Sequence, residues 1–370
     1  ISKNFYKENI MPFNPNYPYN DLALLPPDFD FDDIEILKKV NTANIALSRL
    51  SGEAKSIPNR EVLIEPLTFR EAVASSEIEN INTTIDEAFQ ATYFDEIDLK
   101  KEQKETRSYR ESLLHGYEEI KSRGFLNTNS YIAIQSHLEP TKPGIRKIPV
   151  SIKNDSTGQV LYTPPSGEDL IRTLLSNLEK YFNDFSDDVD ALIKMAVLHY
   201  QFESIHPFLD GNGRTGRILM VLHLCLAKRL ELPILFISGY INQHRAEYYK
   251  LLKDVTTNKN WKDWILFILD AVEEQSIKTS QSVSGIRNLM RDYRDLISVK
   301  LPKIYSAELV EYLFSYSFYS QSSLQNKLNI ASRNTASKYF SELINLGILS
   351  EQKYKNDKVY FCPDFQNLLK

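Results

Sequence analysis

Apolar side chains recur at helical spacing through most of the chain up to residue 296, and this periodicity constrains the fold more than any other feature. Over residues 32–50 they fall roughly on one stripe of a helix: Ile34, Leu37, Val40, Ile45 and Leu50. The same spacing predicts further helices at 67–78, 83–92, 100–122, 128–138, 168–183, 187–204, 213–230, 241–256 and 261–296. We therefore expect an all-α core, preceded over residues 1–31 by an extended arm.

The stretch 145–164 interrupts the helical pattern. Two β-prone runs, IPVSI and QVLYT, flank the turn-rich segment KNDSTG, and two prolines follow them. This order is typical of a β-hairpin. We expect one hairpin, over 148–163, inserted in the helical core.

Residues 300–370 form a different unit. Three helices are predicted within 306–318, 320–329 and 332–349, with Ser320 and Ser332 as N-caps, and a strand–turn–strand follows over 350–363. This order predicts a winged helix-turn-helix domain in which 332–346 is the recognition helix.

Composition and charge exclude several classes of protein. The chain has 370 residues, a net charge of −5 and 42% hydrophobic residues, which is typical of a soluble globular protein without overall attraction to nucleic acid or membranes. It contains neither an apolar signal core nor an apolar run long enough to span a bilayer, so we expect no membrane association. Cys225 and Cys362 lie far apart, which argues against a disulfide framework and favours a cytoplasmic location.

The segment HPFLDGNGRTGR, residues 206–217, combines residue types that suit phosphate chemistry. The glycines allow backbone N–H groups to approach an anion, and the N-terminus of the following helix favours negative charge. Arg214 and Arg217 share a helix face beside that N-terminus and suit a polyphosphate. Asp210 can hold Mg²⁺, and His206 can accept a proton from a hydroxyl group. The segment predicts phosphoryl or nucleotidyl transfer.

Each piece of this segment has an ordinary structural interpretation as well. A histidine at a helix end is usually a cap, and Asp-Gly-Asn-Gly is usually a turn. The contiguous set is more specific, and it resembles the signature of the Fic family at every fixed position. The flanking stretches AVLHYQFESIHPF and YINQHRAEYYKLL, and the upstream hairpin, resemble that family too.

The resemblance implies transfer of AMP from ATP to a Ser, Thr or Tyr hydroxyl of a target protein, with ATP and Mg²⁺ required. It implies that His206 is the base, that Asp210 holds Mg²⁺ and that hairpin 148–163 aligns the target by β-augmentation. Tyr248 and Tyr249 fit an adenine pocket, or else two aromatics on a core helix. The expected nucleotide-binding residues are Gly211, Asn212, Gly213, Arg214, Thr215, Gly216, Arg217, Tyr248 and Tyr249.

Upstream, SSEIENI at 75–81 ends a predicted helix. The positions Ser75, Glu79 and Asn80 resemble the inhibitory motif of self-restrained Fic proteins, although Ser and Glu four apart on a helix are common. The resemblance implies that Glu79 forms a bidentate pair with Arg217 and so withholds this arginine from the terminal phosphate of ATP. We expect an N-terminal helical region with the inhibitory helix at 1–105, a Fic catalytic core at 106–299 and the winged helix at 300–370.

Other functions remain open. Some relatives on this scaffold remove AMP or move another phosphate-containing group, and the chain could instead be a nucleotide-sensing DNA-binding regulator. Residues 332–346 offer Arg333, Asn334, Thr335 and Lys338 for contacts with DNA, but winged helices also bind proteins or dimerise. A homodimer is therefore an open expectation, and the target protein is not identifiable from the sequence.

Overall fold

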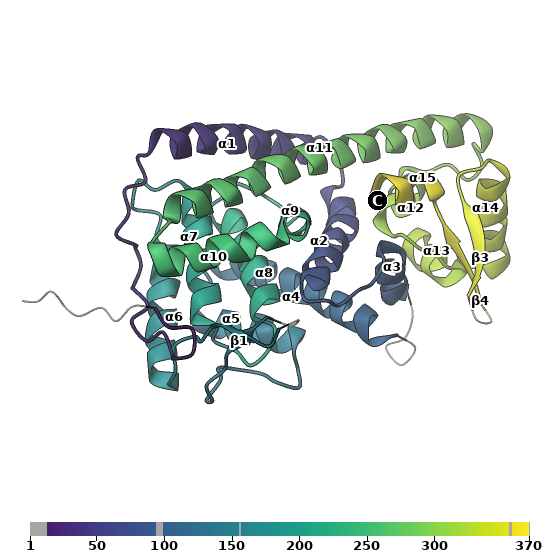
Figure 1. The fold of residues 1–370 in the computed structure, drawn as a ribbon. Coiled ribbons are helices and arrows are strands. Elements are labelled where there is room, and N and C mark those ends of the chain that lie inside the picture. The colour runs from purple at the N-terminus through teal and green to yellow at the C-terminus, as the bar shows by residue number, and fades with distance from the viewer. Residues whose placement is uncertain (1–12, 94–98, 155–156, 355–356, 370) are drawn as a thin grey trace, which may run out of the picture.

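The 40-residue helix α11 (Trp261–Lys300) runs along one side of the molecule and joins its two parts (Figure 1). The structure is a computed structural model that describes residues 13–93, 99–154, 157–354 and 357–369. Residues 1–12 of the expected arm, and residues 155–156 of the expected hairpin, lie outside the described residues. Residues 13–33 have no helix or strand, consistent with the rest of the expected arm.

The larger part is helical, with one small hairpin, as the sequence predicts. Its remaining elements are α1 (Ile34–Lys55), η1 (Arg60–Leu63), α2 (Ile64–Ile78), α3 (Ile85–Tyr93), α4 (Lys101–Arg123), α5 (Thr128–Leu138), β1 (Ile152–Lys153), β2 (Val160–Tyr162), α6 (Glu168–Asn183), α7 (Ala191–Ile205), α8 (Asn212–Leu226), α9 (Ser238–Gln243) and α10 (Arg245–Asn258). The strands of the hairpin are antiparallel and shorter than the two β-prone runs suggest.

The buried stripe of α1 differs from the expected one. Ile34 and Ile45 are 63% and 62% exposed, and Leu37 is exposed too. The stripe that packs against α11 follows i, i+4, i+7, i+11 and i+14, and consists of Ile36, Val40, Ala43, Leu47 and Leu50. This stripe is difficult to recognise in the sequence because it includes Ala43, and alanine occurs on buried and exposed helix faces alike.

The expected helix at 241–256 is in fact two helices, since α9 ends before His244 and α10 begins after it. The expected helix at 187–204 starts later, at Ala191, because the Asp190 side chain accepts a hydrogen bond from the N–H of Leu192 and so caps it.

The smaller part has the predicted winged-helix order. It comprises α12 (Ala307–Ser315), α13 (Gln321–Leu328), α14 (Arg333–Asn345), β3 (Ser350–Tyr354) and β4 (Asp357–Phe361), followed by the unpredicted α15 (Pro363–Leu369). Ser320 caps α13 through the N–H of Ser323. Ser332 occupies the cap position of α14, but its side chain makes no capping hydrogen bond.

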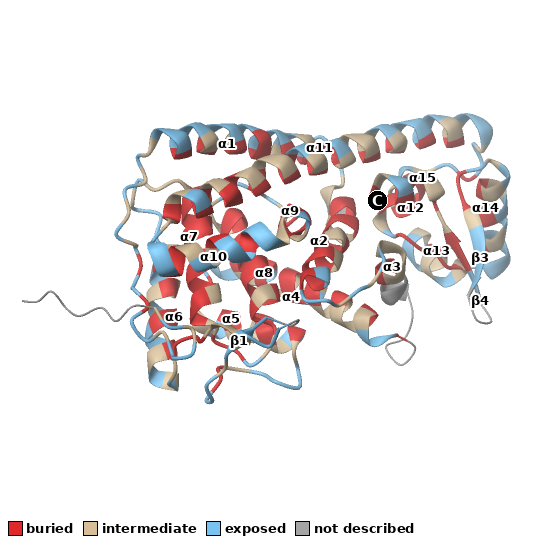
Figure 2. Cartoon of the chain, viewed as in Figure 1, coloured by how far each residue is buried: buried red, intermediate tan, exposed pale blue. Residues whose placement is uncertain are grey.

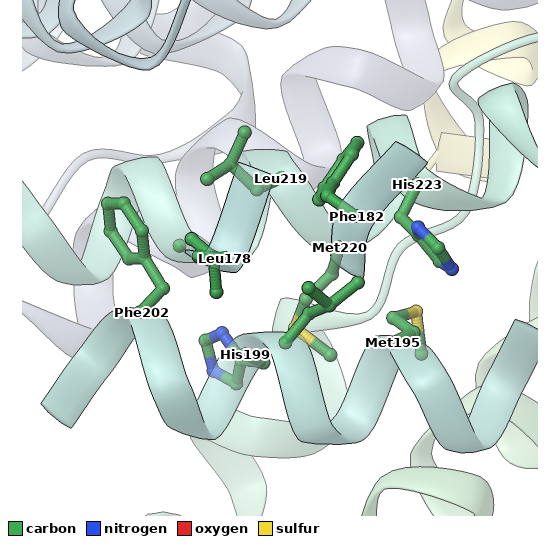
Figure 3. A pocket seen from close by; sticks show the side chains of 10 residues that line it. Leu178, Phe182, Met195, His199, Phe202, Leu219, Met220 and His223 are labelled. Atoms are coloured by element: carbon green, nitrogen blue, oxygen red, sulfur yellow. The ribbon is translucent and has the colours of Figure 1, made fainter. Parts of the chain in front are cut away.

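Helices α7 and α8 form the buried centre of the larger part, and Figure 2 shows both in the colour of buried residues. A cavity of about 10 Å³ lies between α6, α7 and α8, and Figure 3 shows His199 and His223 at its edge among apolar side chains. Burial lowers the pKa of both histidines to about 3, so both are neutral core residues. This cavity is too small for a nucleotide.

In the part of the chain that the structure describes, no helix combines the length and apolar character needed to cross a membrane.

Candidate active site

The loop between α7 and α8 contains two residues with left-handed backbone geometry. His206 ends α7 with φ 48° and ψ 59°, and Gly211 begins α8 with φ 79°. Glycine adopts this conformation without steric cost, whereas a histidine there is strained and needs support from its surroundings. The two turns bring the end of one buried helix to the start of the next.

Asn212 fixes the loop from inside. Its side-chain Oδ1 accepts from the N–H of Phe208, and its Nδ2 donates to the carbonyl of the same residue, both at 2.9 Å. The Asn212 side chain is therefore occupied by the loop itself. The N–H of Gly211 donates to Oδ1 of Asp210 at 2.8 Å, so within 211–213 the backbone N–H groups of Asn212 and Gly213 are the ones that can meet an anion at the positive end of α8.

Two of the expected nucleotide-binding residues, Thr215 and Gly216, are buried and are not exposed at the start of α8. Thr215 is fully buried. At Gly216 a Cβ atom would meet the α7 side chains of Glu203, Phe202 and His199 at 2.3–3.3 Å, so the absence of a side chain allows α8 to pack closely on α7. The structure gives these two residues a place in helix packing.

The charged groups at the start of α8 are already paired with carboxylates or a lysine. Arg214 is buried, and its Nη2 lies 2.5 Å from Oε1 of Glu139. Asp210 accepts a hydrogen bond from Nζ of Lys142 at 2.6 Å. Burial opposes ionisation of Asp210, but Lys142 outweighs it, so the pKa of this carboxyl is lowered.

Arg217 is the most enclosed of these groups, with 1% of its surface exposed. Its Nε donates to Oγ of Ser75 at 2.8 Å, and its Nη2 donates to the Ser75 carbonyl and to Oε1 of Glu79, each at 2.9 Å. The expected bidentate pair is therefore wrong in detail: a single nitrogen, Nη2, meets Glu79 and also the Ser75 carbonyl, while Nε meets the Ser75 hydroxyl.

Glu79 lies directly against the start of α8. A Cβ atom at Gly213 would come within 2.3 Å of Oε1 of Glu79, so a side chain at 213 and this carboxylate cannot occupy the same place. Burial opposes ionisation of Glu79, but Arg217 outweighs it and lowers the pKa of the carboxyl. The carboxylate is thus charged at neutral pH, at a position suited to an anion.

Asn80 explains why helix α2 ends at Ile78, with Glu79 as its C-terminal cap residue. Asn80 has φ 61°, a left-handed conformation that asparagine tolerates better than most residues. Nη1 of Arg245 also lies 3.3 Å from its Oδ1. The helix therefore ends with Glu79 directed at Arg217.

A cavity of about 370 Å³ opens beside this cluster, between the hairpin and α10. Its lining includes Phe13, Ile152, Leu161, Tyr249, Leu252 and Thr256. Tyr249 is 45% exposed, whereas Tyr248 is buried in the core, where its hydroxyl lies 2.8 Å from Nε2 of His199. Only one of the two expected tyrosines lines the cavity.

The sequence patterns did not identify several residues that lie at this site. Glu139, Lys142 and Arg146 lie in the connection between α5 and the hairpin, where charged residues look like an ordinary solvated loop. Glu71 on α2 is a buried carboxyl that accepts from the N–H of Ser238 and the hydroxyl of Tyr109. No motif distinguishes any of them.

The donor set fits a magnesium ion that arrives with a polyphosphate. In the described part of the chain, no three His, Cys, Asp or Glu side chains are grouped to hold a metal. Asp210, however, is a partly exposed carboxylate at the mouth of the site, and it already binds a cation, the Lys142 ammonium. Mg²⁺ is commonly held by one or two carboxylates together with substrate phosphates.

Three family models match the chain in order. "Fic/DOC family N-terminal" matches residues 37–118, "Fic/DOC family" matches 125–224, and "Protein adenylyltransferase SoFic-like, C-terminal domain" matches 289–365. The chain belongs to the Fic/DOC family.

Curated relatives match a limited stretch. Protein adenylyltransferase Fic of Drosophila willistoni and that of Drosophila melanogaster are each 33% identical to this chain over 114 residues. This stretch is 30% of the chain and 21% or 22% of the relative, so the chain spans less than a quarter of the length of either.

Solved structures share the fold. A Fic family protein from Desulfovibrio desulfuricans is 17% identical, with a TM-score of 0.58 over 91% of this chain and 98% of its own. A Fic domain-containing signaling protein from Bacteroides thetaiotaomicron is also 17% identical, with a TM-score of 0.52 over 65% of this chain and 97% of its own.

We expect His206 to remain neutral from pH 7 down to about pH 4. Burial, and then the nearby Arg146 guanidinium, lower the pKa of this imidazole to about 4. The unfolded chain, with a pKa near 6.5, binds this proton first as the pH falls, so His206 reduces the free energy of unfolding progressively between about pH 6.5 and pH 4. NMR titration, with the signal assigned from His206→Asn, measures this pKa; a midpoint near 6.5 contradicts the expectation.

Proposed function

We propose that this protein transfers AMP from ATP to a hydroxyl side chain of a target protein. The observation that carries the proposal is the convergence, at the start of α8, of a neutral, partly buried imidazole, two buried guanidinium groups and three carboxylates, those of Asp210, Glu79 and Glu139. The names of the relatives support the same activity. Phosphoryl-type transfer depends mainly on such positioning and charge stabilisation.

In the proposed reaction, His206 accepts the proton of the target hydroxyl as its oxygen attacks the α-phosphorus of ATP. The new O–P bond joins AMP to the target, and the bond from the α-phosphorus to the bridging oxygen breaks, so that pyrophosphate leaves. Because His206 is neutral at pH 7, it is ready to take the proton. The backbone N–H groups of Asn212 and Gly213, together with Arg214, would stabilise charge on the phosphates. Mg²⁺ held by Asp210 would offset further phosphate charge.

The cavity beside the cluster suits the adenosine part of ATP. It is walled mainly by apolar and aromatic side chains from the hairpin and α10, and its volume lies within the usual range for small-ligand sites. Tyr249, which lines this cavity and is 45% exposed, could stack against the base. The phosphates would then extend from this cavity toward the start of α8.

The hairpin is the proposed docking edge for the target. Among the described residues, β1 pairs only with β2, and Lys153 in β1 is exposed. The carbonyl of Thr163, just after β2, accepts instead from the N–H of Tyr19 in the N-terminal segment. The open edge is therefore that of β1, where an extended segment of a target with a Ser, Thr or Tyr could add as a strand.

We further propose that Glu79 restrains the enzyme. The terminal phosphate of ATP needs Arg217, and Arg217 is occupied by Ser75 and Glu79. ATP could enter with its phosphates misplaced for attack, and the reaction would be slow until the carboxylate moves. The same site could also act on the protein itself.

The winged helix is a candidate for binding DNA. Residues Arg333, Asn334, Thr335 and Lys338 of α14 are all exposed. Two of them have internal partners, because Arg333 donates to Gln321 and Lys338 lies near Glu342. A protein-binding or dimerisation role remains the alternative.

Labelled ATP tests the proposed activity directly. Incubation of the protein with lysate and ATP labelled at the α-phosphate should label protein, whereas label at the γ-phosphate should not be retained. His206→Ala should reduce the α-label by about 10²–10⁴-fold, because the base is lost, while calorimetry should show that ATP still binds. Retention of the γ-label would indicate phosphate transfer, and no label from either would refute the proposal.

The restraint predicts that Glu79→Gly is faster than the wild type. A single charge-assisted contact to a partly exposed carboxylate should be worth about 1.4 kcal/mol, so its loss should raise the initial rate about tenfold. Adding Arg217→Ala should remove the gain. Glu77→Gly is the matched control: it places the same residue two positions earlier, at an exposed glutamate. If Glu79→Gly labels no faster than this control, the segment does not restrain the enzyme.

A further inference from the structure

Arg146 is a buried guanidinium that binds backbone carbonyl groups on two sides of the proposed active site. Only 2% of its surface is exposed. Its Nε donates to the His206 carbonyl at 2.8 Å, its Nη2 to the Pro165 carbonyl at 2.5 Å, and its Nη1 to the Ile148 carbonyl at 3.3 Å. Its backbone N–H also donates to the carbonyl of Pro207 at 2.9 Å.

These partners belong to two separate parts of the site. Ile148 and Pro165 lie just outside the two strands of the hairpin, where the chain enters and leaves it. His206 and Pro207 begin the loop that leads to α8. The rigid, planar guanidinium of Arg146 therefore links the segments that enter and leave the hairpin to the residue proposed as the base.

The stability of the fold alone does not explain why an arginine is buried at position 146. None of the ion pairs between described residues involves Arg146, so carbonyl groups alone meet its charge. Burying a cation without a carboxylate is costly, and an apolar residue of similar volume is often as stable or more stable. The fork geometry of the guanidinium, however, lets it meet several carbonyls at once.

The contact with His206 falls where the backbone needs support. His206 holds a left-handed conformation that non-glycine residues rarely adopt. The direction of its carbonyl group depends on that conformation, and Nε of Arg146 holds this carbonyl. Loss of the contact would allow the backbone, and with it the imidazole, to shift.

We propose that Arg146 is a positioning residue that fixes the distance between the target-docking hairpin and His206. A hydroxyl held along β1 can meet the base only if the hairpin and the loop keep a fixed relation, and Arg146 supplies the direct link. The inference rests on the proposed function of AMP transfer.

The test compares Arg146→Met with a matched control in the Glu79→Gly background, where activity is easiest to measure. Because a shift of about 1 Å in a reacting group can cost about 10²-fold in rate, Arg146→Met should lower kcat for protein labelling about 100-fold. The affinity for ATP, measured by calorimetry, should stay within about threefold, because the groups of α8 and the α10 wall of the cavity are unchanged.

Lys194→Met is the control. Lys194 is also a buried cation, 1% exposed on α7, and its Nζ binds the Asp184 carbonyl and Oδ1 of Asp187 away from the site. Its loss should lower the melting temperature and leave kcat near that of the parent. A kcat for Arg146→Met near that of the parent overturns the proposal, and so does an equal loss in Lys194→Met.

Arg146→Lys keeps the experiment decisive if the methionine variant does not fold. The lysine retains the charge, but its single ammonium cannot span carbonyls on both sides, so kcat should be intermediate and ATP affinity unchanged. A lysine variant as fast as the parent overturns the proposal. If the Glu79→Gly parent itself transfers no AMP, the proposed function fails instead.

Discussion

The Arg217 guanidinium is the group on which the site depends. It projects from the second turn of α8, where it is the most enclosed charged group of the cluster, and three hydrogen bonds tie it to Ser75 and Glu79 at the end of α2. Helix α2 is itself held by the buried carboxyl of Glu71, which accepts from Ser238 and Tyr109. A group suited to a phosphate is therefore kept in place, but occupied, by a neighbouring helix.

Three left-handed residues give the site its shape. His206 turns the chain out of α7, Gly211 turns it into α8, and Asn80 follows Glu79, the C-terminal cap residue of α2. Each turn therefore sets the residue at which a helix of the site begins or ends. Arg146 and Asn212 hold the loop between the two central helices by their hydrogen bonds to backbone groups.

Much of this arrangement could be predicted from the sequence. The helical core, the inserted hairpin and the winged helix follow from periodicity and turn chemistry, and the contact between Glu79 and Arg217 follows from the resemblance of two short motifs. The buried face of α1 could not be assigned correctly, because Ala43 marks a buried face weakly. The contacts of Glu139, Lys142 and Arg146 could not be predicted either. A charged connecting segment has the same sequence pattern whether it is solvated or folded against a loop.

The difference between ATP and ADP in binding tests the central claim most directly, because the two nucleotides differ by the phosphate that Arg217 would contact. Calorimetry with both nucleotides at equal Mg²⁺ should show nearly equal affinities in the wild type, whose Arg217 is occupied. In Glu79→Gly, ATP should bind about tenfold more tightly than ADP, since a contact of about 1.4 kcal/mol becomes available. An ATP-to-ADP affinity ratio that is the same in both proteins would contradict competition for Arg217.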